Sequence, residues 1–67
     1  MNNNFATRIK GLRLSLKATQ NAFAEKIGTT QAALSAYEQG DRMPSVEILT
    51  SISAAFDVSV DWLLGLS

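Results

Sequence analysis

A glycine between two short apolar patterns divides the middle of the chain into two helices. On either side of it apolar residues recur at helical spacing, at Phe23, Ala24, Ile27, Leu34 and Tyr37. Gly28 readily adopts the positive φ with which many helices end, and Thr30 can cap the helix that follows. The stretch therefore predicts helices over 20–27 and 31–39, joined by a tight turn.

Two longer apolar stripes predict helices on either side of this pair. The first runs over 5–16, with apolar residues at i, i+4, i+7 and i+11, namely Phe5, Ile9, Leu12 and Leu16. The second runs over 46–56 after a capping Ser45, with its buried side at Ile48 or Leu49 and at Ile52, Ala55 and Phe56.

A last short helix is predicted over 60–64, between Ser59 as its cap and Gly65 as its end. Trp62 lies within it and is expected to seal the core, which is the common use of a lone tryptophan. Short turns join the helices, and neither a linker nor an internal repeat divides the chain. The sequence therefore predicts one all-α domain of five helices over 1–67.

Composition excludes several kinds of site in these 67 residues. The chain contains neither cysteine nor histidine, so disulfides and the usual zinc sites are ruled out, and no metal or cofactor is expected. Nucleophilic catalysis needs a cysteine, or a serine with a positioned base, and no such motif is present, so an enzyme is not expected. No apolar run approaches the roughly 20 residues of a membrane span and no signal peptide is evident, so a cytoplasmic location is expected.

Charge is distributed unevenly although the net charge is zero. Residues 1–42 hold all six basic residues and three acidic ones, for a net charge of +3. Residues 43–67 hold three acidic residues and no basic one, for a net charge of −3. This asymmetry is compatible with a front that faces DNA and an acidic back, and equally with ordinary solvated charges.

The exposed face of the helix over 31–39 consists of small or amide-bearing residues, namely Gln31, Ala32, Ser35, Ala36 and Gln39. Such a face can approach the base edges of DNA. The sequence around it resembles the helix-turn-helix domain of the lambdoid phage repressors and Cro proteins, and of the wider bacterial family of such regulators. The resemblance covers Arg8 to about Gly65 and is carried by Gln20, Phe23-Ala24, Ile27-Gly28, Leu34, Tyr37-Glu38, Gly40 and the run from Val58 to Leu64.

The resemblance implies a five-helix, lambda-repressor-like fold that binds double-stranded operator DNA, with the helix over 31–39 in the major groove. The implied base contacts are Gln31, Ala32, Ser35 and Ala36, and the implied phosphate contacts are Thr19, Gln20, Gln39 and Arg42. Gln31 would grip an adenine, because a primary amide can donate to N7 and accept from N6 at once. Gln20 would also brace the recognition helix. The two alanines would either receive thymine methyl groups or serve only as helix formers.

The same resemblance implies a structural role for two charged residues. Arg13 and Glu38 match a pair that family members bury as a salt bridge. At the other end of the chain, the three leucines Leu63, Leu64 and Leu66 exceed what the core needs. We therefore expect the last helix to contribute to a weak homodimer, and no small-molecule ligand is evident.

The favoured function is sequence-specific DNA binding as a transcriptional regulator, with repression as the favoured role. The alternative is a protein-interaction module, such as an antitoxin-like domain, that has the same fold but little or no DNA readout. The low basicity and the alanines on the reading face favour this alternative slightly.

Overall fold

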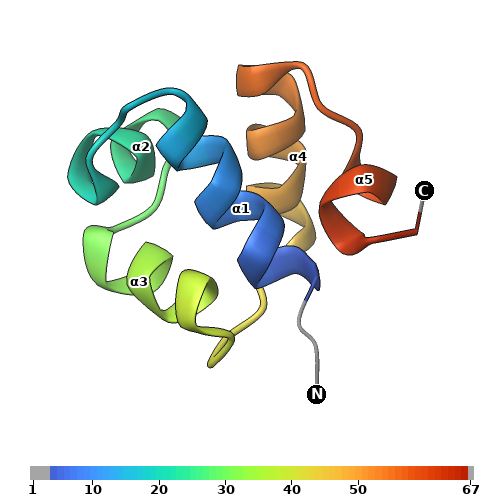
Figure 1. Cartoon of the computed structure of the whole chain (residues 1–67), viewed down its shortest axis with the longest axis horizontal. Coiled ribbons are helices and arrows are strands. Elements are labelled where there is room, and N and C mark those ends of the chain that lie inside the picture. The colour runs from blue at the N-terminus through green and yellow to red at the C-terminus, as the bar shows by residue number, and fades with distance from the viewer. Residues whose placement is uncertain (1–3, 67) are drawn as a thin grey trace.

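Five helices joined by short turns make up the part of the chain that the structure describes, residues 4–66 (Figure 1). In this computed structural model the helices are α1 (Asn4–Ser15), α2 (Gln20–Ile27), α3 (Gln31–Gln39), α4 (Val46–Phe56) and α5 (Val60–Leu64). The predicted all-α, five-helix architecture is confirmed over these residues. The predicted domain limits at residues 1 and 67 lie outside them.

The starts of α2 to α5 follow from local capping. Before each of these helices a serine or threonine in extended conformation accepts a hydrogen bond from the backbone N–H three residues later; the caps are Thr19, Thr30, Ser45 and Ser59. The observed starts agree with the predicted ones because this signal needs only four consecutive residues.

All five helices end in the same kind of turn. Beyond each helix a backbone N–H donates to the carbonyl five residues earlier; the donors are Ala18, Thr29, Asp41, Val58 and Leu66. The residue before each donor has positive φ. Three of these residues are glycines, which adopt this conformation freely, but the other two are Lys17 (φ 55°) and Asp57 (φ 54°).

The turn at Lys17 makes the end of α1 differ from the predicted end. The helix ends one residue earlier than the predicted 5–16, because Lys17 turns the chain after Ser15, and its first described residue is Asn4. Leu16 therefore leaves the apolar stripe and is 51% exposed, so its predicted burial is wrong. Ala55 was also predicted on the buried side of α4 but is exposed, and that side is formed by Leu49 and Ile52.

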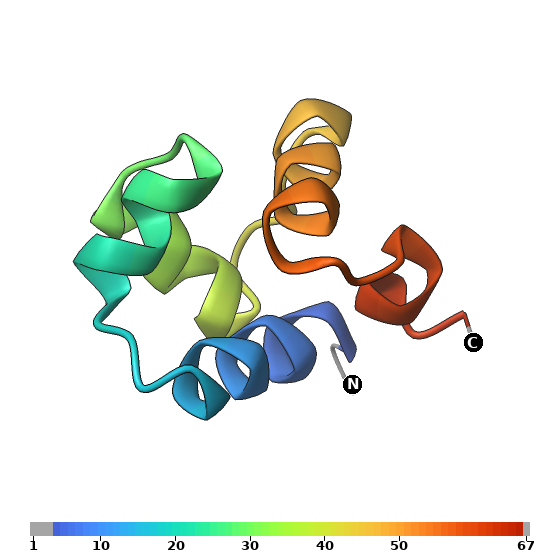
Figure 2. The same ribbon diagram turned by 90° about the horizontal axis from the view of Figure 1, so that it is seen from above.

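The core lies around α1, which packs against α3 on one side and α5 on the other (Figure 2). Helices α2 and α4 pack against each other and close the core. Every helix contributes to this core, through Phe5, Ile9, Phe23, Ala24, Ile27, Leu34, Tyr37, Leu49, Ile52 and Leu63. Two aromatic pairs add directional contacts, with Phe5 edge-on to Tyr37 and Phe23 stacked on Phe56.

Helix α5 uses its leucines differently from the prediction. Leu63 is fully buried and Leu64 is partly buried against the core, whereas Leu66 is 72% exposed. The prediction that Leu63 is surplus to the core is therefore wrong. Trp62 is partly buried at the edge of the core, where the guanidinium of Arg8 lies 5.1 Å from its ring and donates to its backbone carbonyl.

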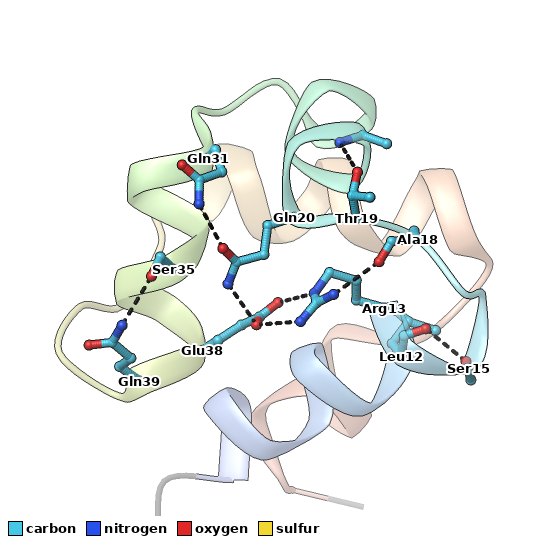
Figure 3. A network of polar contacts seen from close by, with 11 residues as sticks. Leu12, Arg13, Ser15, Ala18, Thr19, Gln20, Gln31, Ser35, Glu38 and Gln39 are labelled. Carbon is cyan, nitrogen blue, oxygen red and sulfur yellow. Dashed lines mark hydrogen bonds and ion pairs between the residues drawn. The ribbon is translucent and has the colours of Figure 1, made fainter.

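An ion pair joins α1 to α3 (Figure 3). The Nε of Arg13 donates to Oε2 of Glu38 over 2.7 Å, and its Nη2 donates to Oε1 over 3.0 Å. Nη1 of the same guanidinium donates to the carbonyl of Ala18, in the turn that ends α1. The side chains of Arg13 and Glu38 are only 12% and 4% exposed, so the pair is largely removed from water.

Glu38 is kept ionised by this arrangement. Burial alone would raise the pKa of its carboxyl, but hydrogen bonds from Arg13 and Gln20, together with the charges of Arg13 and Lys10, outweigh burial and hold the pKa below its ordinary value. The hydrogen bond to Glu38 likewise raises the pKa of the Arg13 guanidinium. The pair is therefore fully charged at neutral pH.

The left-handed backbone conformation of Lys17 leads to a first prediction. Lys17→Gly should raise the free energy of unfolding by about 0.5–1 kcal/mol, because glycine relieves the Cβ clash at this φ. Urea unfolding of both proteins measures the difference. Lys17→Ala is the matched control, since it removes the same side chain but keeps the Cβ. Equal stability of the glycine and alanine variants would contradict the assigned strain.

The ion pair leads to a second prediction. Arg13→Met should lower the free energy of unfolding at pH 7 by about 3 kcal/mol, because Glu38 is left buried without its cation. Lys26→Met, which changes an exposed lysine of α2, should stay within about 0.5 kcal/mol of the wild type.

This destabilisation should also depend on pH. In the wild type the folded pKa of Glu38 lies below its ordinary 4.5, so its contribution is present above about pH 4.5 and is lost as pH falls through the folded pKa. In Arg13→Met the burial of Glu38 is no longer opposed by Arg13, which raises that pKa. Protonation of Glu38 at acid pH then removes part of the destabilisation. The stability difference should therefore begin to shrink above pH 4.5, where Glu38 of the variant takes up its proton, and should continue to shrink as pH falls through the folded pKa of the wild type. A difference that stays constant from pH 7 to pH 3 would refute the pairing.

Candidate nucleic-acid interface

The outward face of α3 carries the residues that the sequence assigned to base contacts. Gln31 and Ala32 are exposed, and Ser35 and Ala36 are partly buried. Leu34 and Tyr37 point the opposite way into the core, which fixes the rotation of the helix about its axis. The face is therefore formed by small side chains around two exposed glutamines, Gln31 near its start and Gln39 at its end.

A chain of hydrogen bonds connects Gln31 to the ion pair (Figure 3). Its Nε2 donates to Oε1 of Gln20 over 2.7 Å, and Nε2 of Gln20 donates to Oε1 of Glu38 over 3.1 Å. The structure thus brings together Gln20 and Gln31, as the expected bracing requires, and adds Glu38 as the acceptor for Gln20. Gln20 is the first residue of α2 and Gln31 the first of α3, so this chain also joins the starts of the two helices.

The contact between Gln20 and Glu38 is a feature that the sequence reasoning missed. Glu38 was assigned only to Arg13, yet it lies seven residues after Gln31, which is two turns along the same helix face. This spacing indicates that one side chain from a neighbouring helix can contact both positions. Which side chain does so depends on how α2 is set against α3.

Besides Gln20, the three remaining predicted phosphate contacts occupy three different settings. The Thr19 hydroxyl oxygen accepts from the backbone N–H of Ala22 over 3.1 Å, which leaves its own proton available. Nε2 of Gln39 donates to the hydroxyl oxygen of Ser35 over 3.0 Å, so these two predicted contacts lie side by side. Arg42 is exposed in the segment between α3 and α4.

Metal clusters and membrane-spanning helices are both absent from the described residues. Within residues 4–66 no group of three or more acidic, cysteine or histidine side chains could hold a metal ion. No helix among them is long and apolar enough to cross a membrane.

Comparison with known proteins places this geometry in a family. A helix-turn-helix family model matches residues 9–63. An uncharacterised helix-turn-helix-type transcriptional regulator, YqaE of Bacillus subtilis, is 43% identical over 60 residues, covering 90% of this chain and 52% of that protein. The cryptic phage CTXphi transcriptional repressor RstR of Vibrio cholerae is 33% identical over 58 residues, covering 87% and 52%. The chain thus spans about half the length of these curated relatives.

A solved structure also matches the fold. The P22 c2 repressor protein, crystallised in complex with a synthetic operator, superposes with a TM-score of 0.90 at 30% identity, over 98% of this chain and all of that one. The predicted lambda-repressor-like fold and the resemblance to phage and bacterial regulators are thereby confirmed. This chain belongs to the helix-turn-helix family that includes these regulators and repressors.

Proposed function

We propose that this chain binds double-stranded operator DNA in a sequence-specific manner and acts as a transcriptional regulator, with repression as its role. The observation that carries the proposal is the outward face of α3, where Gln31 is held by Gln20 among small side chains. The match to a repressor in complex with a synthetic operator supports it. The role is binding, without catalysis, in the cytoplasm.

The shape of the face suits insertion of α3 into the major groove. Small side chains at Ala32, Ser35 and Ala36 let the helix backbone approach the base pairs closely. Gln31 keeps one Nε2 hydrogen and its Oε1 after binding Gln20, which is the donor and acceptor pair that an adenine edge requires. The alanine methyl groups can meet thymine methyls beside it.

Phosphate contacts would hold the helix in register. Thr19 and Gln20 at the start of α2 each keep a hydrogen to donate, and Gln39 and Arg42 lie at and beyond the end of α3. The chain has only six basic residues and no net charge, so sequence-independent attraction to DNA should be weak. Binding would therefore depend on base contacts to an unusual degree.

A weak homodimer completes the proposal. Two recognition helices about 34 Å apart would enter successive major grooves on one side of the DNA. The part of the C-terminal region that remains available for this contact is Leu66, which is 72% exposed, beside the partly buried Trp62 and Leu64. This is a smaller apolar surface than the sequence suggested, which is consistent with weak association.

Selection of bound sites from a random duplex pool tests the DNA-binding proposal. The wild type should enrich one motif, and Gln31→Ala should lose preference at one base pair by about 5- to 150-fold. Gln39→Ala is the matched control, because loss of a phosphate contact should weaken all sites nearly equally. Failure of the wild type to enrich any sequence would reject the proposal in favour of a protein-interaction module, which the zero net charge also suits.

Sedimentation equilibrium tests the dimer. The wild type should associate weakly at high concentration, and Leu66→Ser should reduce that association because it removes an exposed apolar side chain. The selected motif should be an inverted repeat, with half-sites one helical turn apart. A strictly monomeric protein that selects single half-sites would remove the dimer.

A further inference from the structure

The side-chain amide of Gln31 has a defined orientation, with its nitrogen toward Gln20. This orientation originates at Glu38, the residue beyond Gln20 in the hydrogen-bond chain. In the order Gln31, Gln20, Glu38, each amide nitrogen donates to an oxygen of the next residue, over 2.7 Å and 3.1 Å. Figure 3 shows these side chains pointing toward one another in sequence, with Arg13 beyond Glu38. The chain therefore runs in one direction, from the exposed face to the buried pair.

Glu38 dictates this direction because an ionised carboxylate can only accept hydrogen bonds. Gln20 must therefore turn its amide nitrogen toward Glu38, which leaves its amide oxygen facing Gln31. Gln31 must then turn its own nitrogen toward that oxygen. The ionised state is secured by the lowered pKa of Glu38, and its 4% exposure leaves little room for water to supply other donors.

The direction decides what Gln31 offers to DNA. As observed, Gln31 keeps one hydrogen and one carbonyl oxygen, which complement N7 and the N6 amino group of adenine. In a reversed chain the oxygen of Gln31 would accept from Gln20 with one lone pair and keep the other, and both nitrogen-bound hydrogens would face outward. Two outward donors also complement guanine, whose N7 and O6 are both acceptors, so the advantage of adenine would be lost.

We infer that Glu38 is a positioning residue for base selection, which makes Gln31 prefer adenine to guanine through the fixed orientation of Gln20. The inference rests on the proposed DNA-binding function. It adds a specificity role to a residue that otherwise has only a structural role in the ion pair.

The other amide on the same face provides a contrast. Nε2 of Gln39 donates to the hydroxyl of Ser35, and a hydroxyl can both accept and donate. The orientation of Gln39 is therefore not dictated by its partner. Of the two glutamines on α3, only Gln31 is connected to a carboxylate.

Glu38→Gln tests the inference because it replaces one acceptor oxygen by a donor and keeps the size of the side chain. The base pair read by Gln31 is first identified as the one whose preference disappears in Gln31→Ala. There the wild type should prefer adenine to guanine by about tenfold or more. In Glu38→Gln this preference should fall to within about threefold, while preferences at other positions persist.

Arg13→Met is the matched control, measured at pH 8 to favour the ionised form of Glu38 in both proteins. It breaks the same ion pair and loses stability, but it keeps the acceptor-only carboxylate beside Gln20. Its preference for adenine should remain within about threefold of the wild type. Equal loss of this preference in both variants would show that Glu38 acts only through stability and would overturn the inference.

A measurement on the wild type alone covers the case in which a variant does not fold. Scalar coupling across the hydrogen bond should join the side-chain nitrogen of Gln31 to the side-chain carbonyl of Gln20 in DNA-free protein. Coupling in the reverse sense would overturn the inference. Failure of the wild type to select any DNA site would reject the proposed function, and the inference with it, whereas an unchanged Glu38→Gln would reject the inference alone.

Discussion

A carboxylate buried on α3 needs several hydrogen-bond donors, and these donors come from the two helices packed against it, α1 and α2. The Glu38 side chain is 4% exposed, and an unpaired charge at such a site would cost several kcal/mol. Arg13 at the end of α1 and Gln20 at the start of α2 supply the donors. The same guanidinium also binds the carbonyl of Ala18, which ties the connection between these two helices to the pair. The relative placement of α1, α2 and α3 thus depends on satisfying this one group.

Apolar packing alone would leave this placement less sharply defined. Side chains such as Leu34 and Ile27 can repack with small shifts of a helix, because hydrophobic burial has no direction. Hydrogen bonds to a carboxylate tolerate only short distances and narrow angles. The core therefore supplies most of the free energy of folding, and the polar chain from Gln31 to Arg13 sets the register of the helix-turn-helix.

The features that could be predicted from the sequence are those that depend on residues close together in the chain. The limits of α2 to α5 follow from capping hydroxyls such as Thr19 and from glycines such as Gly28, and each signal acts within a few positions. The end of α1 was predicted one residue too late, because Lys17 adopts a positive φ that is not expected for a lysine. Leu63 was misjudged because the short α5 gives too few residues for periodicity to define its buried side.

The candidate site follows the same division. Helical periodicity identified the outward face of α3, since Leu34 and Tyr37 define its inward side. The polarity of Gln31 was beyond sequence analysis, because it requires Gln20 to lie between Gln31 and Glu38 in space. On the proposed function, the base preference of Gln31 is therefore not fixed by its residue type alone. An amide presents a donor and an acceptor in an order set by its partners, so substitutions at position 38 and at position 31 should be interpreted together.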